Sequence, residues 1–278
     1  IEAENLPVEL ASMPHEGLWG VFRFKQGFGG SVVRDVGAWD KPLNYYGGTL
    51  YAAGLALREK RTALRRSGEA TAADLPDTVR IKTADEWRQT MAALPSPHVL
   101  QSWEWGEIKS QTGWTADRIA VRRNGELVGA YQFLTRQPSE YVPLSIGYVP
   151  KGPLVDWSDS AAVDLLLDSV QKHAKERGCI FVKIDPDVRS DRAAGVALIS
   201  KLKRRGWRFS ADQIQFQNTA ISRLPADLSE LQPAMKSKWR YNIRLAARRG
   251  ISVRQGGEGD LHAFYDMYAE TGERDGFL

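Results

Sequence analysis

The chain has 278 residues, with 38 lysines and arginines against 34 aspartates and glutamates, giving a formal net charge of +4. Hydrophobic residues make up 42% and charged residues 26%, which excludes a disordered or collagen-like chain. The single cysteine excludes an internal disulfide framework and a multi-cysteine metal site. No apolar run approaches the roughly 20 residues that span a bilayer, and no signal peptide is visible, so we expect a cytoplasmic protein.

The first part of the chain combines short strand patterns with a glycine-rich turn. Alternation of aromatic and basic residues over Val21–Lys25 predicts a strand, and the glycines in 27–30 predict a tight turn before a second strand at 31–36. Residues 43–66 are expected to form a helix with a basic, solvated end. The small polar residues 67–78 are the clearest linker in the chain.

Beyond the linker the pattern becomes an alternation of strands and helices. Thr83, with Glu86 three residues later, predicts a capping box, and Asn124-Gly125 predicts a hairpin turn. The expected strands are 79–82, 118–123, 126–136, 146–153, 179–184, 213–221 and 251–254, and the expected helices are 84–94, 102–112, 160–177, 191–205, 227–249 and 258–272. This order favours the α/β or α+β class with a mixed sheet.

A basic helix is the sharpest local feature. Lys236, Arg240, Arg244 and Arg248 recur every four residues, which aligns them in one stripe along a helix. Like charges at this spacing repel by a few tenths of a kcal/mol, so a bound polyanion such as tRNA phosphates or a pyrophosphate would relieve a cost. The alternative is a solvated face whose side chains lie over the core. The spacing leaves both interpretations open.

Three further lysines are candidates for charge stabilisation or phosphate binding. Lys25 lies between Phe24 and the glycine-rich turn, where a fixed cation would stabilise a developing oxyanion. Lys109 lies on the helix that carries Trp103, and Lys151 precedes a Gly-Pro pair at the end of a strand. For each of them an ordinary surface lysine is the alternative.

Several kinds of catalytic site have no signal in the sequence. There is no Walker phosphate loop and no G-x-G-x-x-G fingerprint, and the four histidines lack metal-ligand spacing. His173 is expected to be structural, Cys179 to be an inert core thiol, and Asp185 to be either a cleft residue or part of an Asp-Pro turn. No metal, redox cofactor or covalent nucleophile is therefore expected.

Five stretches in order along the chain resemble the FemABX family of non-ribosomal peptidyl transferases. They are QSWEWGEIK (101–109), GYVPKGPLVD (147–156), KIDPDV (183–188), KSKWRYNIRLAARRGISVR (236–254) and FYDMYAETGERDGF (264–277). In addition, GLWGVFRFKQGFGGSVVRDVGAWD (17–40) resembles the carboxy-terminal motif of such enzymes.

The resemblance implies tandem GNAT-like acyltransferase domains and transfer of an amino acid from aminoacyl-tRNA to an amine of lipid II or UDP-MurNAc-pentapeptide, which builds a cell-wall peptide bridge. It assigns oxyanion stabilisation to Lys25 with Phe24, and precursor binding to Lys109, with Lys151 and Trp103 as further substrate contacts. The stripe of Lys236, Arg240, Arg244 and Arg248 would then contact tRNA. Peripheral membrane association would follow from the lipid substrate.

The order of the motifs departs from the family. A motif expected near a carboxy terminus comes first, so the chain is interpreted as a fragment that joins the tail of one module to the head of the next. The expected parts are a carboxy-terminal segment (1–66), a linker (67–77), a first GNAT-like domain (78–213) and the beginning of a second one (214–278). Such a fragment is expected to be inactive by itself.

Two other functions remain as alternatives. One is an acyl-CoA-dependent GNAT N-acyltransferase, although the glycine-rich pyrophosphate loop of that fold is not found in the expected context. The other is a non-catalytic RNA-binding module built on the basic helix. The amino acid transferred and the acceptor amine are not specified by the sequence.

Overall fold

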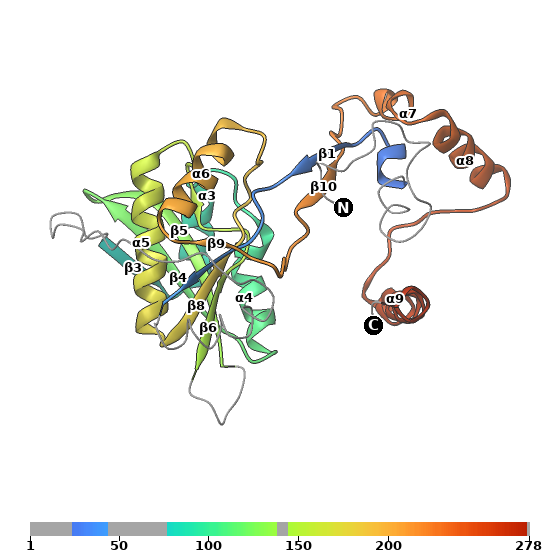
Figure 1. Cartoon of the computed structure of the whole chain (residues 1–278). Helices are drawn as coiled ribbons and strands as arrows, with labels where there is room; N and C mark the ends of the chain where they lie inside the picture. The colour runs from blue at the N-terminus through green and yellow to red at the C-terminus, as the bar shows by residue number, and fades with distance from the viewer. Residues whose placement is uncertain (1–23, 44–76, 138–143, 277–278) are drawn as a thin grey trace. The chain divides into compact units, whose positions relative to one another are not determined.

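The computed structural model describes residues 24–43, 77–137 and 144–276 (Figure 1). The chain divides into two compact units. The described part of the first unit is 32–43, 77–137 and 144–219, and that of the second is 24–31 and 220–276. Among the described helices, none is long and apolar enough to cross a membrane.

The first unit is built on a mixed sheet. Its strands are β2 (Trp39–Pro42), β3 (Asp77–Ile81), β4 (Thr115–Arg123), β5 (Glu126–Arg136), β6 (Ser145–Val149), β7 (Leu154–Val155), β8 (Cys179–Ile184) and β9 (Arg208–Phe209). Their order is β3-β4-β5-β6-β8-β2-β9, with β7 paired to β5. The neighbours β6 and β8 run parallel, whereas the other pairs are antiparallel. The expected α/β class with a mixed sheet is therefore confirmed.

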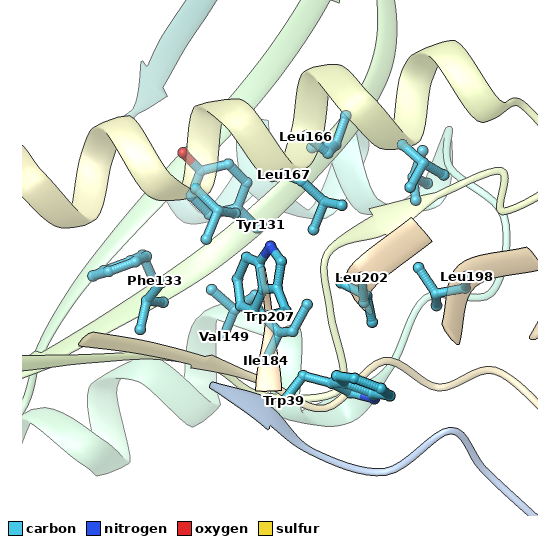
Figure 2. Packing of buried hydrophobic residues seen from close by; sticks show 14 of the residues in the cluster. Trp39, Tyr131, Phe133, Val149, Leu166, Leu167, Ile184, Leu198, Leu202 and Trp207 are labelled. Atoms are coloured by element: carbon cyan, nitrogen blue, oxygen red, sulfur yellow. The ribbon is translucent and has the colours of Figure 1, made fainter. Parts of the chain in front are cut away.

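Helices cover both faces of this sheet because alternate strand residues face opposite sides. The helices are α3 (Ala84–Ala92), α4 (Trp103–Ser110), α5 (Ser160–Glu176) and α6 (Ala193–Arg204). Side chains of α5 and α6, such as Leu166 and Leu202, pack with Ile119 and Tyr131 in the larger core cluster, part of which is shown in Figure 2. On the other face, Trp87 of α3 packs with strand residues in a smaller cluster.

Local signals in the sequence formed most of the expected structures, although the capping box at Thr83 is present only in its N-cap half. Thr83 accepts a hydrogen bond from the Glu86 amide, and Asp159 caps α5 by accepting from the amides of Ala161 and Ala162. Asn124 and Gly125 both have positive φ, 54° and 84°, as a two-residue hairpin turn between β4 and β5 requires.

His173 and Cys179 are structural, as expected. The His173 Nε2 lies 3.0 Å from Asp117 Oδ2 on β4, and its ring packs edge-on against Phe133. Cys179 is buried, and burial raises the pKa of its thiol to about 11, which leaves it in the unreactive thiol form.

The strand β2 joins the sheet from the amino-terminal part of the chain and lies next to the edge strand β9. It pairs with β8 on one side and β9 on the other, with Asp40 opposite Lys183. Its Trp39 is 2% exposed and belongs to the core cluster (Figure 2). Part of the segment that was expected to be a separate module tail is therefore an internal strand of the first unit.

The second unit is mostly helical in its described part. It contains α7 (Leu231–Ala234), α8 (Ser237–Arg248), and α9 (Leu261–Asp275), which follows a short 3-10 turn at Glu258–Asp260. The strand β1 (Ser31–Arg34) pairs with β10 (Asn218–Ile221) in a separate two-stranded sheet, and the division between the units falls within these two strands.

Two strand predictions were wrong over the described residues, and a third holds only in part. Phe24–Gly27 is helical, because Phe24 and Phe28, four residues apart, lie on one side of the turn and both contact Trp239. The strand expected at 213–221 is reduced to β10, since the Gln213 side chain instead bonds to the backbone of Ala38 and Ser210. Residues 251–254 lie in no described sheet, and Val253 is 96% exposed. The helix expected at 43–66 and the linker at 67–77 lie almost wholly outside the described residues.

Candidate substrate-binding and transfer sites

In the first unit, Lys109 lies on α4, a helix that is held to β4 by hydrogen bonds from the buried Arg118. The Lys109 Nζ lies 5.1 Å from the centroid of the Trp105 ring, and the side chain is half-buried. A cation over an indole face is attracted by the negative face of the ring. The arrangement presents a positioned ammonium on α4, which suits binding of an anionic group.

Trp103 on the same helix is engaged by Arg118 of β4. The Arg118 guanidinium carbon lies 3.6 Å from the centroid of the Trp103 ring. Arg118 also donates to the Trp103 carbonyl, to Glu107 and to Gln132. One face of the Trp103 ring is thus covered by the Arg118 guanidinium. Trp103 therefore helps to hold α4 against β4, and only the uncovered part of its ring is left to contact a ligand.

Lys151 lies in the turn after β6, with its ammonium between two carboxylates. Its Nζ is 2.7 Å from Asp35 Oδ2 and 3.2 Å from Asp187 Oδ1, and the side chain is only 11% exposed. Burial lowers the pKa of Lys151, but the hydrogen bond and charge of Asp35 and the charge of Asp187 outweigh it and raise the pKa above its usual value. Lys151 therefore stays protonated and is already paired.

Asp185 and Tyr148 support this turn from the ends of β8 and β6. Asp185 accepts hydrogen bonds from the Lys151 amide at 2.5 Å and from the Tyr148 hydroxyl at 2.7 Å. These bonds stabilise Lys151 in a left-handed conformation with φ of 46°. Burial raises the pKa of Asp185 to about 6, against the lowering effect of the Tyr148 hydrogen bond. Asp185 is thus a buried structural carboxylate that holds the Lys151 turn, and its role goes beyond that of an Asp-Pro turn.

Asp35 and Tyr148 are members of this cluster that sequence reasoning missed. Asp35 is 116 positions before Lys151 along the chain. It lies in the stretch 17–40 that resembles the family, but no spacing within that stretch marks it as the partner of Lys151. Tyr148 likewise stands in a family-like stretch, 147–156, which is the signal that draws attention to it.

In the second unit, the helical turn with Phe24 and Lys25 packs against the start of the basic helix. The Phe24 ring lies 6.3 Å from Trp239 of α8. The Lys236 amide donates to the Gly27 carbonyl, and the Lys236 Nζ donates to the Gln26 side chain. A Cβ at Gly27 would lie 2.2 Å from the Trp239 ring, so only glycine permits this approach. Lys25 itself is exposed on this turn.

The predicted stripe of basic residues forms on α8, with its members in different surroundings. Arg240 donates to the carbonyls of Pro233 and Met235, and with Ser229, Gln232 and Pro233 it lines an open pocket. Arg244 and Arg248 are exposed, and within the described residues neither makes an ion pair. The carboxy-terminal half of the stripe is thus available to an anionic partner.

The predicted residues therefore form two groups, one in each unit. Lys109, Trp103 and Lys151 lie in the first unit, whereas Phe24 and Lys25 lie in the second with the basic stripe. Among the described residues, no group of histidine, cysteine, aspartate or glutamate side chains is arranged to bind a metal ion.

Comparisons with known proteins agree with the stretches that carry the resemblance. Residues 82–278 match the model of the FemAB family. The chain is 36% identical over 191 residues to a lipid II:glycine glycyltransferase of Staphylococcus aureus (strain MRSA252), covering 66% of this chain and 45% of that protein. It is similar to the crystal structure of FemX at 32% identity and a TM-score of 0.60, covering 73% of this chain and 51% of FemX. A tandem GNAT protein from the clavulanic acid biosynthesis pathway also matches, at 14% identity and a TM-score of 0.39, over 70% of this chain and 57% of that one.

The chain spans less than half the length of the curated relatives that it matches. The family match nevertheless covers well over half of the chain itself, from the end of β3 through α9. The chain therefore belongs to the FemAB family.

Proposed function

We propose that the protein containing this chain transfers an amino acid from aminoacyl-tRNA to an amine of a peptidoglycan precursor, either lipid II or UDP-MurNAc-pentapeptide. The family match over residues 82–278, together with 36% identity to a relative named for transfer of glycine to lipid II, carries this proposal. Glycine and lipid II are therefore the first donor group and acceptor to test. Because lipid II is a membrane lipid, we propose that the protein works at the cytoplasmic face, as a peripheral protein.

The proposed reaction needs positioned charge but no covalent nucleophile. The acceptor amine attacks the ester carbonyl carbon of the aminoacyl-tRNA, a C–N bond forms, and the ester C–O bond breaks. The tRNA hydroxyl leaves with a proton that originates from the amine. A cation near the carbonyl oxygen stabilises the tetrahedral oxyanion, and we assign this role to Lys25, with Phe24 beside it limiting access of water.

The basic stripe on α8 is the proposed contact for the donor. Arg244 and Arg248 are exposed and have no described acidic partner, so that binding a phosphate relieves their mutual repulsion at no cost in broken ion pairs. Lys236 and Arg240 continue the stripe towards the Phe24–Gly27 turn, whose Gln26 side chain accepts from Lys236. The proposed donor contact and the proposed catalytic lysine thus belong to the same unit.

The acceptor contact is assigned to α4 of the first unit. Lys109 over the Trp105 ring is the proposed cation for the precursor phosphate. Trp103 is already engaged by Arg118, and Lys151 by the two carboxylates, so we assign both a supporting role within the first unit and leave the contact with the precursor phosphate to Lys109.

The test assays the complete gene product and, in parallel, the 278-residue chain, each with glycyl-tRNA and lipid II as substrates. The expected result for the complete protein is consumption of glycyl-tRNA that depends on lipid II. Acetyl-CoA turnover without aminoacyl-tRNA would instead support an N-acetyltransferase. Binding of tRNA with no turnover by the complete protein would support an RNA-binding module.

A charge-reversed pair tests the donor contact. Arg244→Glu with Arg248→Glu should weaken tRNA binding by at least about tenfold and lower its salt dependence, since each lost phosphate contact reduces the slope of log K against log salt by about 0.7 to 0.9. Lys203→Glu with Arg204→Glu on α6 is the matched control, because both residues are exposed at the end of a helix and the change in charge is identical. Equal loss of binding in both pairs would refute a specific role for α8.

A further inference from the structure

A second cation associated with a tryptophan ring lies near Lys109 in the first unit. Arg136 is the last residue of β5, and its guanidinium carbon lies 5.8 Å from the centroid of the Trp114 ring. The Trp114 amide donates to the Lys109 carbonyl at 3.2 Å, which fixes this tryptophan to the end of α4. Lys109 and Arg136 are therefore both direct neighbours of Trp114.

The strand register places Arg136 on the face of the sheet that α4 covers. Arg118 of β4 pairs with Gln132 of β5, and the Arg118 side chain bonds to the Trp103 carbonyl and to Glu107 of α4. Paired residues of antiparallel strands share a face, and so do residues two and four positions apart along a strand. Arg136 comes four residues after Gln132 on β5, so it lies on the same face as α4.

The charges of these two cations are not neutralised within the part of the chain that the structure describes. Neither Lys109 nor Arg136 forms an ion pair with a residue in 24–43, 77–137 or 144–276. Both glutamates of α4, Glu104 and Glu107, are paired with other arginines. Lys109 is half-buried and Arg136 is exposed, so both reach the solvent. An anion that contacts both would reduce their mutual repulsion and form charge-assisted hydrogen bonds.

The indole rings restrict both side chains. Lys109 at 5.1 Å from the Trp105 centroid and Arg136 above Trp114 lie within the range of about 6 Å over which a ring attracts a cation. Long cationic side chains lose conformational entropy when a ligand immobilises them, and this loss is smaller when they are already held. The pair is thus prepared for a ligand with two linked anionic groups.

We propose that Arg136 is a second phosphate-binding residue of the acceptor site, and that Arg136 and Lys109 together bind the two phosphates of a diphosphate. This inference rests on the proposed function, because lipid II and UDP-MurNAc-pentapeptide both carry their sugar on a diphosphate. The Lys109 ammonium contacts one phosphate as a point charge, and the Arg136 guanidinium contacts the other through two parallel N–H groups. A ligand with a single phosphate occupies only one half of the pair.

Binding measurements on the complete protein test the pair. Isothermal titration calorimetry gives the dissociation constants of UDP-MurNAc-pentapeptide, of lipid II in detergent micelles, and of MurNAc-pentapeptide 1-phosphate, which has one phosphate. Arg136→Gln and Lys109→Gln should each weaken binding of the diphosphate ligand by about tenfold or more, because each loses one charge-assisted contact. With the monophosphate ligand, only one of the two variants should bind more weakly than the native protein.

Arg208→Gln is the matched control. Arg208 is also an exposed arginine in a strand of the same sheet, but it lies on the edge strand β9, and the change in charge is identical. Its dissociation constants should equal those of the native protein. With glycyl-tRNA as donor, Arg136→Gln should raise KM for the acceptor with little change in kcat, which a general loss of folding does not produce. Equal weakening by Arg208→Gln would refute the proposal.

The outcomes separate this inference from the proposed function. If the native protein binds and uses the precursor while Arg136→Gln matches it in affinity and KM, only the role of Arg136 is refuted. If both variants weaken binding of the monophosphate ligand equally, the pair acts as one phosphate site and the inference is refuted. A native protein that binds neither diphosphate precursor refutes the acceptor assignment and this inference with it. The precursor that shows the tighter native binding and the larger loss identifies the source of the diphosphate.

Discussion

Replacing Asp185 by asparagine should remove a pH dependence of stability that the fold imposes on this carboxyl group. Burial raises the pKa of Asp185 to about 6 from its ordinary value of 3.8. Between these pH values the folded state keeps the proton and the unfolded state has released it, so the free energy of unfolding falls as the pH rises. The difference between 3.8 and about 6 corresponds to a contribution of at most about 3 kcal/mol, lost by pH 7. Asp185 is 3% exposed, so little of this effect is screened by solvent.

The Asp185→Asn variant keeps the geometry because its amide oxygen accepts from the Lys151 amide and its NH₂ donates to the Tyr148 hydroxyl oxygen. Urea unfolding of both proteins from pH 4 to pH 7 measures the difference in unfolding free energy. The variant should gain stability relative to the native chain as the pH rises through this range, and the difference should be small at pH 4. Tyr148→Phe, which removes a hydrogen bond to the ionised carboxylate, should move the native transition to higher pH. A difference between the native chain and Asp185→Asn that does not change with pH would refute the reasoning.

Three further substitutions test the fold and the site. Gly106→Ala should lower the free energy of unfolding by about 1 to 3 kcal/mol, because a Cβ there would lie 2.3 Å from both Arg118 Nη2 and Gln132 Oε1. Gly259→Ala, with no atom within 4 Å of its Cβ, is the control for thermal unfolding, and an equal loss would contradict the packing argument. Asp159→Ala should cost about 1 kcal/mol, since α5 loses two capping hydrogen bonds, and no loss in urea unfolding would show that the cap is dispensable. In the complete protein, Lys25→Met should lower kcat by about 100-fold or more with little change in KM, and an effect confined to KM would assign Lys25 to binding alone.

Elements with strong local signals were predictable from the sequence. The cap at Thr83, the hairpin at Asn124-Gly125 and the basic helix α8 each depend on residues a few positions apart, so their physics is contained within a short window. The strand expected at 21–25 was a weak pattern over five residues. There, tertiary contact of Phe24 and Phe28 with Trp239 outweighed the alternation.

The candidate site was predictable only in its residue types. Lys109, Lys151 and the stripe on α8 were identified as cations from their positions in the sequence, but charge alone does not distinguish a paired lysine from an available one. The structure pairs Lys151 with Asp35 and Asp187, whereas Arg244 and Arg248 remain exposed. The distinction depends on residues far apart along the chain, which no local pattern contains.

The sequence by itself determined the class of the protein: a chain with +4 net charge, enough apolar residues for a core, alternating strands and helices, and the motifs of the FemAB family. Tertiary structure alone decided where the amino-terminal segment belongs. The placement of β2 between β8 and β9 results from burying Trp39 and from neutralising Lys183 with Asp40. Leaving the Trp39 ring exposed to water or Lys183 buried without its carboxylate would each cost free energy. Both contributions depend on contacts between distant parts of the chain, so no local sequence pattern contains them.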